Sequence, residues 1–188
     1  MIILISAVSG TGKTLMAQQL LEKYHVPYLS MDHLKMGLYR GGWNCGFTPL
    51  DREEVIGEKL WPVVKGIIMT NIENRQDIII EGSYLLPQYI KDFDIEYKER
   101  IIPVFMGFSK DYIRENFEAK IVKHRNAVEY RKWPEERTIT ELIEEHEEFK
   151  AKCLLAGVRY FEIEKDYENQ IVDVYEYIES ERLRIGTI

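Results

Sequence analysis

The segment from residue 7 to residue 14 reads AVSGTGKT and comes just after the apolar run of residues 1–5. A glycine-rich turn between a strand and a helix lets successive backbone N–H groups point into one hollow, where they can surround phosphate oxygens. Gly10 and Gly12 permit such a turn, because a Cβ would oppose the backbone angles or stand between the main chain and the phosphates. The segment therefore predicts a phosphate-binding loop, called the phosphate loop below, with a strand before it and a helix after it.

The end of the phosphate loop carries the residue types that nucleoside triphosphate chemistry needs. Lys13 can bridge the β- and γ-phosphates as a compact cation, and the Thr14 hydroxyl is placed to bind the Mg²⁺ that accompanies the nucleotide. Ala7 stands where the usual motif has glycine, which we expect the loop to tolerate if this residue ends the strand with a negative φ. The predicted nucleotide-binding residues are Ser9, Gly10, Thr11, Gly12, Lys13, Thr14 and Leu15, and Lys13 is also predicted to be catalytic.

Short runs rich in Ile, Val, Phe and Tyr alternate with longer helical patterns, which is typical of strand–helix–strand units around a parallel sheet. The expected strands are residues 1–6, 27–30, 77–81, 100–106 and 158–163. The expected helices are residues 13–24, 51–74 with a kink at Pro62, about 109–125, one capped by Thr138 with Glu141, and 167–184. We therefore expect one α/β domain over residues 1–188, with three α/β/α layers and a five-stranded parallel sheet.

Composition restricts the compartment and the partners. The first apolar run is far shorter than the roughly 20 residues of a membrane-spanning helix, so we expect a cytoplasmic protein without a membrane partner. A formal net charge of −7 argues against broad electrostatic attraction to nucleic acid. The 2 cysteines and 4 histidines have no metal-ligand spacing, which makes a zinc site unexpected.

Asp32 follows the apolar run of residues 26–29, at the end of a strand expected to neighbour the first one. There its carboxylate would face the γ-phosphate, where it can accept the proton of a substrate hydroxyl or hold that hydroxyl in line. Another interpretation is that Asp32 caps a short helix beginning at His33, and both interpretations can hold together. We predict Asp32 as a catalytic and substrate-binding residue.

Glu81 ends the run of residues 77–81, which is typical of a buried central strand that delivers a carboxylate to its tip. In proteins with a phosphate loop, this place holds the residue that orients the magnesium ion. We predict Glu81 and Thr14 as the metal residues and leave open that Glu81 binds the substrate. The alternative is a solvated strand end, although a buried strand seldom ends in an acid without a partner.

Residues 110–137 contain a basic stretch and are predicted to form a lid over the phosphates. Such a lid supplies positive charge during phosphoryl transfer and excludes water. Arg125 and Arg131 are predicted as its catalytic residues, although the sequence leaves open which arginine reaches the phosphates. The acceptor pocket is expected from residues 33–47 and 83–89, with Arg40 and Tyr84 as substrate contacts.

These parts, in this order, resemble the P-loop kinases of small molecules. That group contains adenylate-kinase-like enzymes, shikimate and gluconate kinases, 2-phosphoglycerate kinases and zeta-toxin-like kinases. Asp32-His33 and the segment of residues 81–87 are most similar to the 2-phosphoglycerate-kinase-like members. The resemblance implies a P-loop NTPase fold of the nucleoside-kinase type with a small lid. It also implies a phosphotransferase that uses ATP and Mg²⁺ and moves the γ-phosphoryl group to a small metabolite.

Two other functions are compatible with a phosphate loop. A nucleotide-dependent switch would need no acceptor, but the chain has no Asn-Lys-x-Asp sequence and no Asp-x-x-Gly after a strand. A kinase of RNA ends or of nucleotide-sugar precursors is the third possibility, and the acidic charge balance disfavours RNA. We therefore expect a small-molecule phosphoryl acceptor and no nucleic-acid partner.

Overall fold

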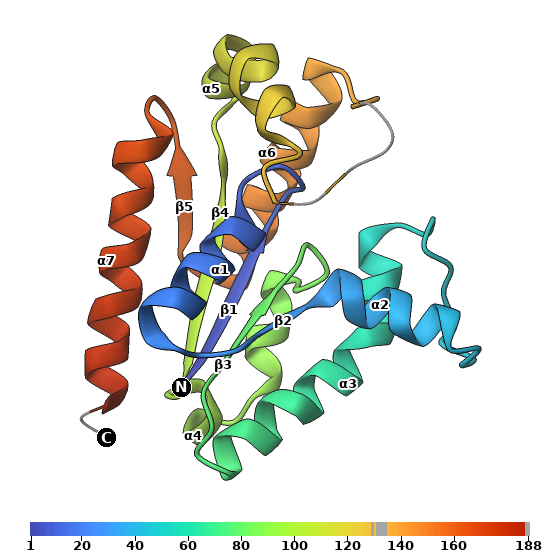
Figure 1. Ribbon diagram of the computed structural model, residues 1–188, viewed down its shortest axis with the longest axis vertical. Helices are drawn as coiled ribbons and strands as arrows, with labels where there is room; N and C mark the ends of the chain where they lie inside the picture. Colours follow the sequence, from blue (N-terminus) through green and yellow to red (C-terminus); the bar gives the residue numbers. More distant parts are fainter. Residues whose placement is uncertain (129, 131–134, 187–188) are drawn as a thin grey trace.

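The computed structural model describes residues 1–128, 130 and 135–186. Its five strands form one parallel sheet in the order β2-β3-β1-β4-β5. The strands are β1 (Ile2–Ala7), β2 (Tyr28–Ser30), β3 (Ile78–Glu81), β4 (Ile101–Phe108) and β5 (Tyr160–Ile163). All carboxyl ends therefore lie at one edge, toward α5 and the start of α6 in Figure 1. The predicted five-stranded parallel sheet is confirmed.

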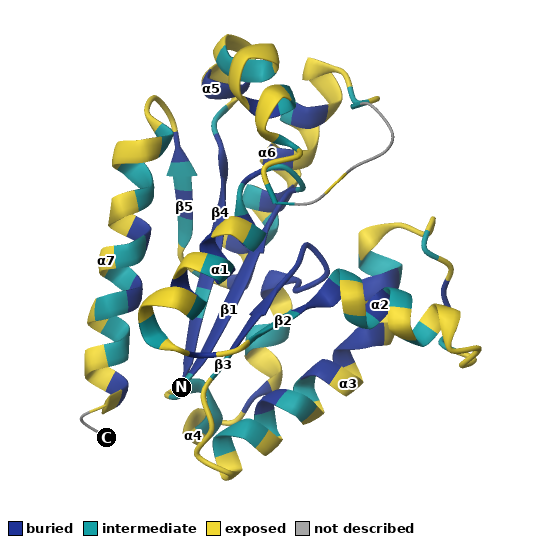
Figure 2. Ribbon diagram, in the orientation of Figure 1, coloured by how far each residue is buried: buried dark blue, intermediate teal, exposed yellow. Residues whose placement is uncertain are grey.

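Helices cover both faces of the sheet. They are α1 (Lys13–Tyr24), α2 (Met31–Arg40), α3 (Glu53–Glu73), α4 (Ile95–Lys98), α5 (Lys110–Asn116), α6 (Ile139–Ala156) and α7 (Tyr167–Gly186), with a 3₁₀ turn η1 (Pro87–Asp92) and a π-helical segment η2 (Phe117–Val122). Alternate side chains of β1 point to opposite faces of the sheet. Ile3 and Ile5 pack with α1 and α7 on one face, and Leu4 packs with α3 on the other. A further cluster joins Phe105 of β4 to α5 and α6. The central strands β1, β3 and β4 are accordingly buried between helices whose outer sides are exposed, whereas the edge strands β2 and β5 are partly buried (Figure 2).

The helix expected over residues 109–125 is present but changes from α-helical to π-helical partway along, which the sequence did not predict. Its start is confirmed, because the Ser109 hydroxyl accepts the backbone N–H of Tyr112 at 3.1 Å. The α-helix ends at Asn116, whose side chain donates to the carbonyl of Tyr112 at 3.0 Å and whose backbone leaves the α region with φ −121°. A side-chain amide that competes for a helix carbonyl offers the backbone another conformation, and the chain continues as the π-helical η2.

The helix that follows β2 begins earlier than expected. It starts at Met31 directly after Ser30, so Asp32 lies in its first turn and does not cap it. The capping interpretation of Asp32 was therefore wrong, although a carboxylate in a first turn still favours the helix through the positive end of its dipole. The capping box of Thr138 and Glu141 is confirmed, since the two residues exchange hydrogen bonds at the start of α6.

Among the described residues, we find no helix that combines enough length and apolar character to cross a bilayer.

Candidate active site

The phosphate loop connects β1 to α1 at the carboxyl edge of the sheet. Gly10 and Gly12 both have φ +95°, in the left-handed region that favours glycine, whereas Ala7 still belongs to β1 and has no positive φ. A Cβ on Gly12 would also collide with the hydroxyl of Tyr167. The loop therefore needs glycine at both positions for its backbone and at position 12 for space as well.

Hydrogen bonds hold this loop in shape. The Thr11 hydroxyl donates to the carbonyl of Val8 at 2.6 Å, and Tyr167 of α7 donates to the carbonyl of Thr11 at 3.3 Å. Lys13 is the first residue of α1 and is only 8% exposed. Because the first N–H groups of α1 have no acceptor within the helix, they and the helix dipole favour a bound anion here. The predicted glycine-rich turn between a strand and a helix is thus present as a folded loop whose geometry suits a bound anion.

Thr14 and Glu81 meet beside the loop. The Thr14 hydroxyl lies 3.3 Å from Oε2 of Glu81, at the tip of β3. Burial raises the pKa of the Glu81 carboxyl, while a hydrogen bond from Ser30 and the charge of Lys13 oppose that rise. A hydroxyl and a carboxylate at this distance supply only oxygen donors, which suits a hard cation such as Mg²⁺. The two residues predicted for the metal therefore fit it.

Asp32 is held by two neighbours through a single oxygen. Its Oδ1 accepts from Lys35 Nζ at 2.8 Å and from the Tyr84 hydroxyl at 3.2 Å. Burial raises the pKa of the Asp32 carboxyl, but the hydrogen bond and charge of Lys35, with the charge of Lys13, outweigh it and hold this pKa below its usual value. Asp32 is thus a carboxylate at neutral pH. The structure brings it together with Tyr84, as expected, and with Lys35, which the sequence reasoning missed.

Glu53 is a second acidic group that the sequence reasoning missed. It lies in the first turn of α3 and hydrogen-bonds to Ser83. Although the residue as a whole is exposed, desolvation of its carboxyl raises its pKa, and Ser83 and the charge of Lys13 oppose the rise. An acid in a first turn is also a common helix-start signal, so its position in the sequence did not distinguish it.

Arg137, at the end of the predicted lid, contacts the phosphate loop. Its Nη2 donates to the carbonyl of Ser9 at 3.4 Å, and its other nitrogens bind Glu135 at 2.9 Å and Glu145 at 2.6 Å. The hydrogen bond from Arg137 lowers the pKa of Glu135 to about 2. One sequence feature could have singled out Arg137. It directly precedes the capping box of α6, and this helix start fixes the position of that end of the predicted lid.

The structure describes one of the two arginines predicted as catalytic residues of the lid. Arg125 is half-buried, and its Nε lies 3.9 Å from Oε2 of Glu135, the carboxylate that also binds Arg137. Arg131 lies outside the described residues. Arg125 is therefore close to the contact between lid and loop, through Glu135.

Two other predicted residues lie at the margin of the site or away from it. Arg40 is the exposed last residue of α2. The 1.5 Å rise per residue of an α-helix puts it about 12 Å along the helix axis from Asp32. The structure therefore does not bring Arg40 to the Asp32–Tyr84 cluster. Leu15 follows the loop in α1 and is 37% exposed.

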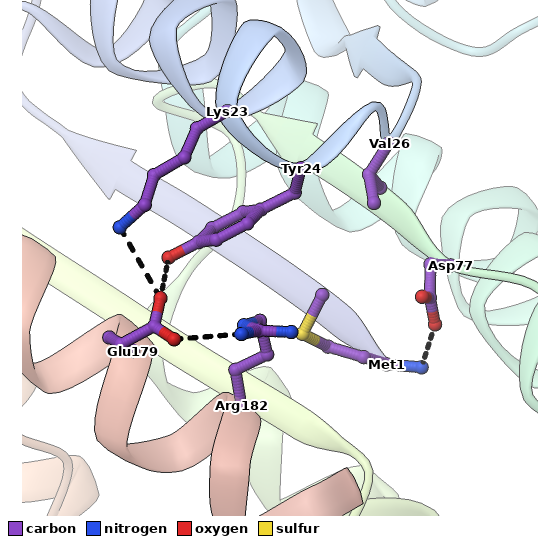
Figure 3. A pocket seen from close by; sticks show the side chains of 7 residues that line it. All are labelled: Met1, Lys23, Tyr24, Val26, Asp77, Glu179 and Arg182. Atoms are coloured by element: carbon purple, nitrogen blue, oxygen red, sulfur yellow. Dashed lines mark hydrogen bonds and ion pairs between the residues drawn. The ribbon is translucent and has the colours of Figure 1, made fainter.

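A cavity of about 540 Å³ lies at the opposite edge of the sheet (Figure 3). It is lined by Met1, Lys23, Tyr24, Val26, Asp77, Glu179 and Arg182. Its charges are paired within the protein, because the Met1 ammonium binds Asp77 and the Glu179 carboxylate accepts from Lys23, Tyr24 and Arg182. The charged groups of this cavity are thus engaged in ion pairs with one another, and the cavity is remote from the phosphate loop.

Comparison with known proteins supports the fold. No protein-family model matches the chain, and no curated protein matches it by sequence. The solved shikimate kinase from Bacteroides thetaiotaomicron is 15% identical with a TM-score of 0.56, over 95% of this chain and 98% of that one. The shikimate kinase from Aquifex aeolicus is 17% identical with a TM-score of 0.52, over 97% and 98%.

A sugar kinase from Janibacter sp. HTCC2649 is 14% identical with a TM-score of 0.51, over 95% of this chain and 94% of that one. The matches extend over nearly the whole length of both partners in each case. The chain therefore has the fold of the P-loop small-molecule kinases, as the sequence predicted.

Proposed function

We propose that this protein is a kinase that uses ATP and Mg²⁺ and transfers the γ-phosphoryl group to a small metabolite. The observation that carries the proposal is the Asp32 carboxylate, held by Lys35 and Tyr84 within the electrostatic reach of Lys13. A protein that only binds a nucleotide has no need of a second, oriented carboxylate beside its phosphate loop. A kinase needs one to align its acceptor.

We propose a task for each group in this reaction. The phosphate loop amides and Lys13 would bind the polyphosphate, and Thr14 and Glu81 would hold the Mg²⁺ that neutralises its charge. Asp32 would accept a hydrogen bond from the acceptor hydroxyl and direct its oxygen at the γ-phosphorus. The new P–O bond forms as the bond to the β–γ bridging oxygen breaks, ADP leaves, and the hydroxyl proton passes to Asp32 or to water.

The lid completes the site in this proposal. Arg137 already touches the loop at Ser9, so its positive charge lies next to the phosphate position. Glu135 and Glu145 hold its guanidinium from the other side. An arginine placed in this way stabilises charge on the transferred group, and the segment that carries it keeps water away from the nucleotide. We propose the same role for Arg125 and for Arg131.

The finer proposal concerns the acceptor and the setting. The resemblance of Asp32-His33 and of residues 81–87 supports a 2-phosphoglycerate-like acceptor, and the fold equally suits a nucleotide-like one. We also propose that the protein acts in the cytoplasm, without nucleic acid or membrane as partner. The net charge of −7 supports the absence of a nucleic-acid partner, and filter binding of RNA at low salt tests that absence.

The function is tested by a phosphotransfer screen with ATP and Mg²⁺ over nucleosides, nucleoside monophosphates, sugars, sugar acids and phosphoglycerates. ADP release is the first signal, and ³¹P NMR of the product confirms transfer. Lys13→Ala should abolish transfer with the melting temperature unchanged, whereas Lys23→Ala, at the other end of α1, should keep it.

A preference for GTP with slow hydrolysis and no phosphorylated product in any reaction would favour the nucleotide switch instead. Transfer by Lys13→Ala at the rate of the parent protein would show that the phosphate loop is not the catalytic site.

A further inference from the structure

We propose that Lys35 is a positioning residue that holds Asp32 by one oxygen so that the other oxygen meets the acceptor. This inference rests on the proposed function, because it concerns the same site. Lys35 would act on the reaction only through Asp32 and would touch neither ATP nor the acceptor.

The contacts form a closed triangle of three side chains from two elements. Lys35 lies one turn after Asp32 in α2, and Tyr84 lies in the segment after β3. Lys35 donates to Asp32 Oδ1 and to the Tyr84 hydroxyl, and Tyr84 donates to the same Oδ1. Two donors that converge on one oxygen fix the plane of the carboxylate. Within the described part of the chain, Oδ2 of Asp32 receives no hydrogen bond.

The burial of the three residues differs in the way a positioning role requires. Lys35 is 8% exposed and Tyr84 is 7% exposed, so the two holders belong to the interior. The side chain of Asp32 is 49% exposed. An ion pair between two exposed chains contributes little and is loosely held, but here the lysine is packed in place. The carboxylate therefore faces solvent, and its supports do not.

The same geometry argues against Lys35 as a direct receptor for an anionic acceptor. Its ammonium has three donors, and two are used by Asp32 and Tyr84. Nζ also lies 4.7 Å from the centre of the Tyr84 ring, which adds a cation–π contact to the hydrogen bond. Only the third donor is left for a ligand, and the ammonium that carries it is held in the interior by the other two.

The charged groups around Asp32 come from several elements. Lys13 of α1 and Lys35 favour its ionised form, and Tyr84 donates to it. Glu81 of β3 interacts with Asp32 as a like charge, and Glu53 of α3 interacts with Tyr84. Removal of Lys35 leaves Lys13 to oppose both burial and the Glu81 charge. The Asp32 carboxyl should then titrate at higher pH.

The first arm of the test needs neither nucleotide nor acceptor. The Asp32 carboxyl carbon is followed by ¹³C NMR from pH 2 to pH 7 and is assigned by its loss in Asp32→Asn. We expect Lys35→Met to raise the Asp32 pKa, Lys35→Arg to raise it less, and the matched control Lys23→Met, which breaks the ion pair with Glu179, to leave it unchanged. An Asp32 titration that is the same in Lys35→Met and the parent protein would overturn the proposal.

The second arm uses an acceptor found by the phosphotransfer screen. We expect Lys35→Met to lower kcat by about 10-fold to 100-fold, as for other loss of support to a catalytic group, with the KM for ATP unchanged. The acid limb of kcat against pH should move upward, and Lys35→Arg should restore most of kcat. A rise in the acceptor KM alone, with kcat and its pH profile unchanged, would show that Lys35 binds the acceptor and would overturn the proposal.

The two arms separate this inference from the proposed function. If the parent protein phosphorylates no acceptor, the proposed function fails, and the NMR titration still decides whether Lys35 controls Asp32. If Lys35→Met does not fold, Lys35→Arg and Tyr84→Phe give the same two readouts, and no change of the Asp32 pKa in either would count against the proposal.

Discussion

The Thr14 hydroxyl and the Glu81 carboxylate lie 3.3 Å apart, although they are 67 positions apart in the chain. The parallel pairing of β1 with β3 creates this relationship, because it places Glu81 beside Ile5 and so beside the start of the phosphate loop. The carboxyl edge of the sheet therefore presents two oxygen ligands next to a polyphosphate cradle.

Glu81→Gln should separate stability from metal binding. Burial raises the pKa of Glu81, so the ionised carboxyl costs stability once the pH passes its unfolded pKa. The amide removes that cost, and we expect a free energy of unfolding at pH 7 at least as high as that of the parent protein. The Mg²⁺ concentration for half-maximal activity should rise by about 10-fold or more. Urea unfolding and Mg²⁺ titration check the two parts, with Glu179→Gln as the control that leaves Mg²⁺ dependence unchanged.

Arg137→Met should impair phosphoryl transfer strongly. Arg137 contacts the Ser9 carbonyl, and an arginine that stabilises the transferred group contributes a factor of roughly 10³ or more. The matched control is Arg114→Met, since Arg114 is an exposed lid arginine whose ion pair is with Asp111. Steady-state kcat under saturating ATP is the measurement. Equal kcat values for the two variants would contradict the role given to Arg137.

Two glycine substitutions in the phosphate loop should lower the stability of the protein for different physical reasons. Among the described residues, a Cβ at position 10 would meet only the methyl of Ile121 at 3.9 Å, so the cost of Gly10→Ala is the left-handed backbone, about 1–2 kcal/mol. Gly12→Ala adds a collision with Tyr167 and should destabilise the protein more. In a double-mutant cycle, Tyr167→Ala should recover the excess but not the backbone cost. Additive effects of Gly12→Ala and Tyr167→Ala in urea unfolding would mean that the two residues do not interact.

His146 should make stability fall in mild acid. It is 2% exposed, its Nδ1 accepts the backbone N–H of Phe108 at 2.9 Å, and burial lowers its pKa to about 3. The unfolded chain then binds a proton that the folded chain does not. His146 thus lowers the free energy of unfolding by about 1.4 kcal/mol for each pH unit below about 6.5.

The check is urea unfolding at pH 7, 6 and 5. His146→Asn should flatten the decline between these values, and His124→Asn, at an exposed position, should leave it as steep as in the parent protein. A decline of the same slope in His146→Asn would exclude His146 as its source.

The strands, most of the helices and the phosphate loop could be predicted from the amino-acid sequence. These features depend on local patterns. Short apolar runs predict strands. Gly10 and Gly12 predict a turn with positive φ, which other residues adopt rarely. Thr138 and Glu141, three positions apart, form a capping box that predicts the start of a helix. The positions of Asp32 and Glu81 at the sheet edge could also be predicted from the chain alone, because Asp32 closely follows the end of β2, Glu81 ends β3, and parallel strands end at one edge.

Which distant side chains meet at that edge depends on the tertiary structure and could not be predicted from the sequence. In the sequence Lys35 looks like an ordinary helix residue, and only the fold shows that Tyr84, after β3, contacts it. Arg137 is likewise one of several basic residues in the predicted lid, and only the fold shows its contact with Ser9, 128 positions away. Arg40, on the same helix as Asp32, is carried away from the site by the axis of α2. The physical reason is that periodicity determines which face of an element is buried, whereas contacts between polar side chains depend on where packed elements cross, and no local pattern encodes that crossing.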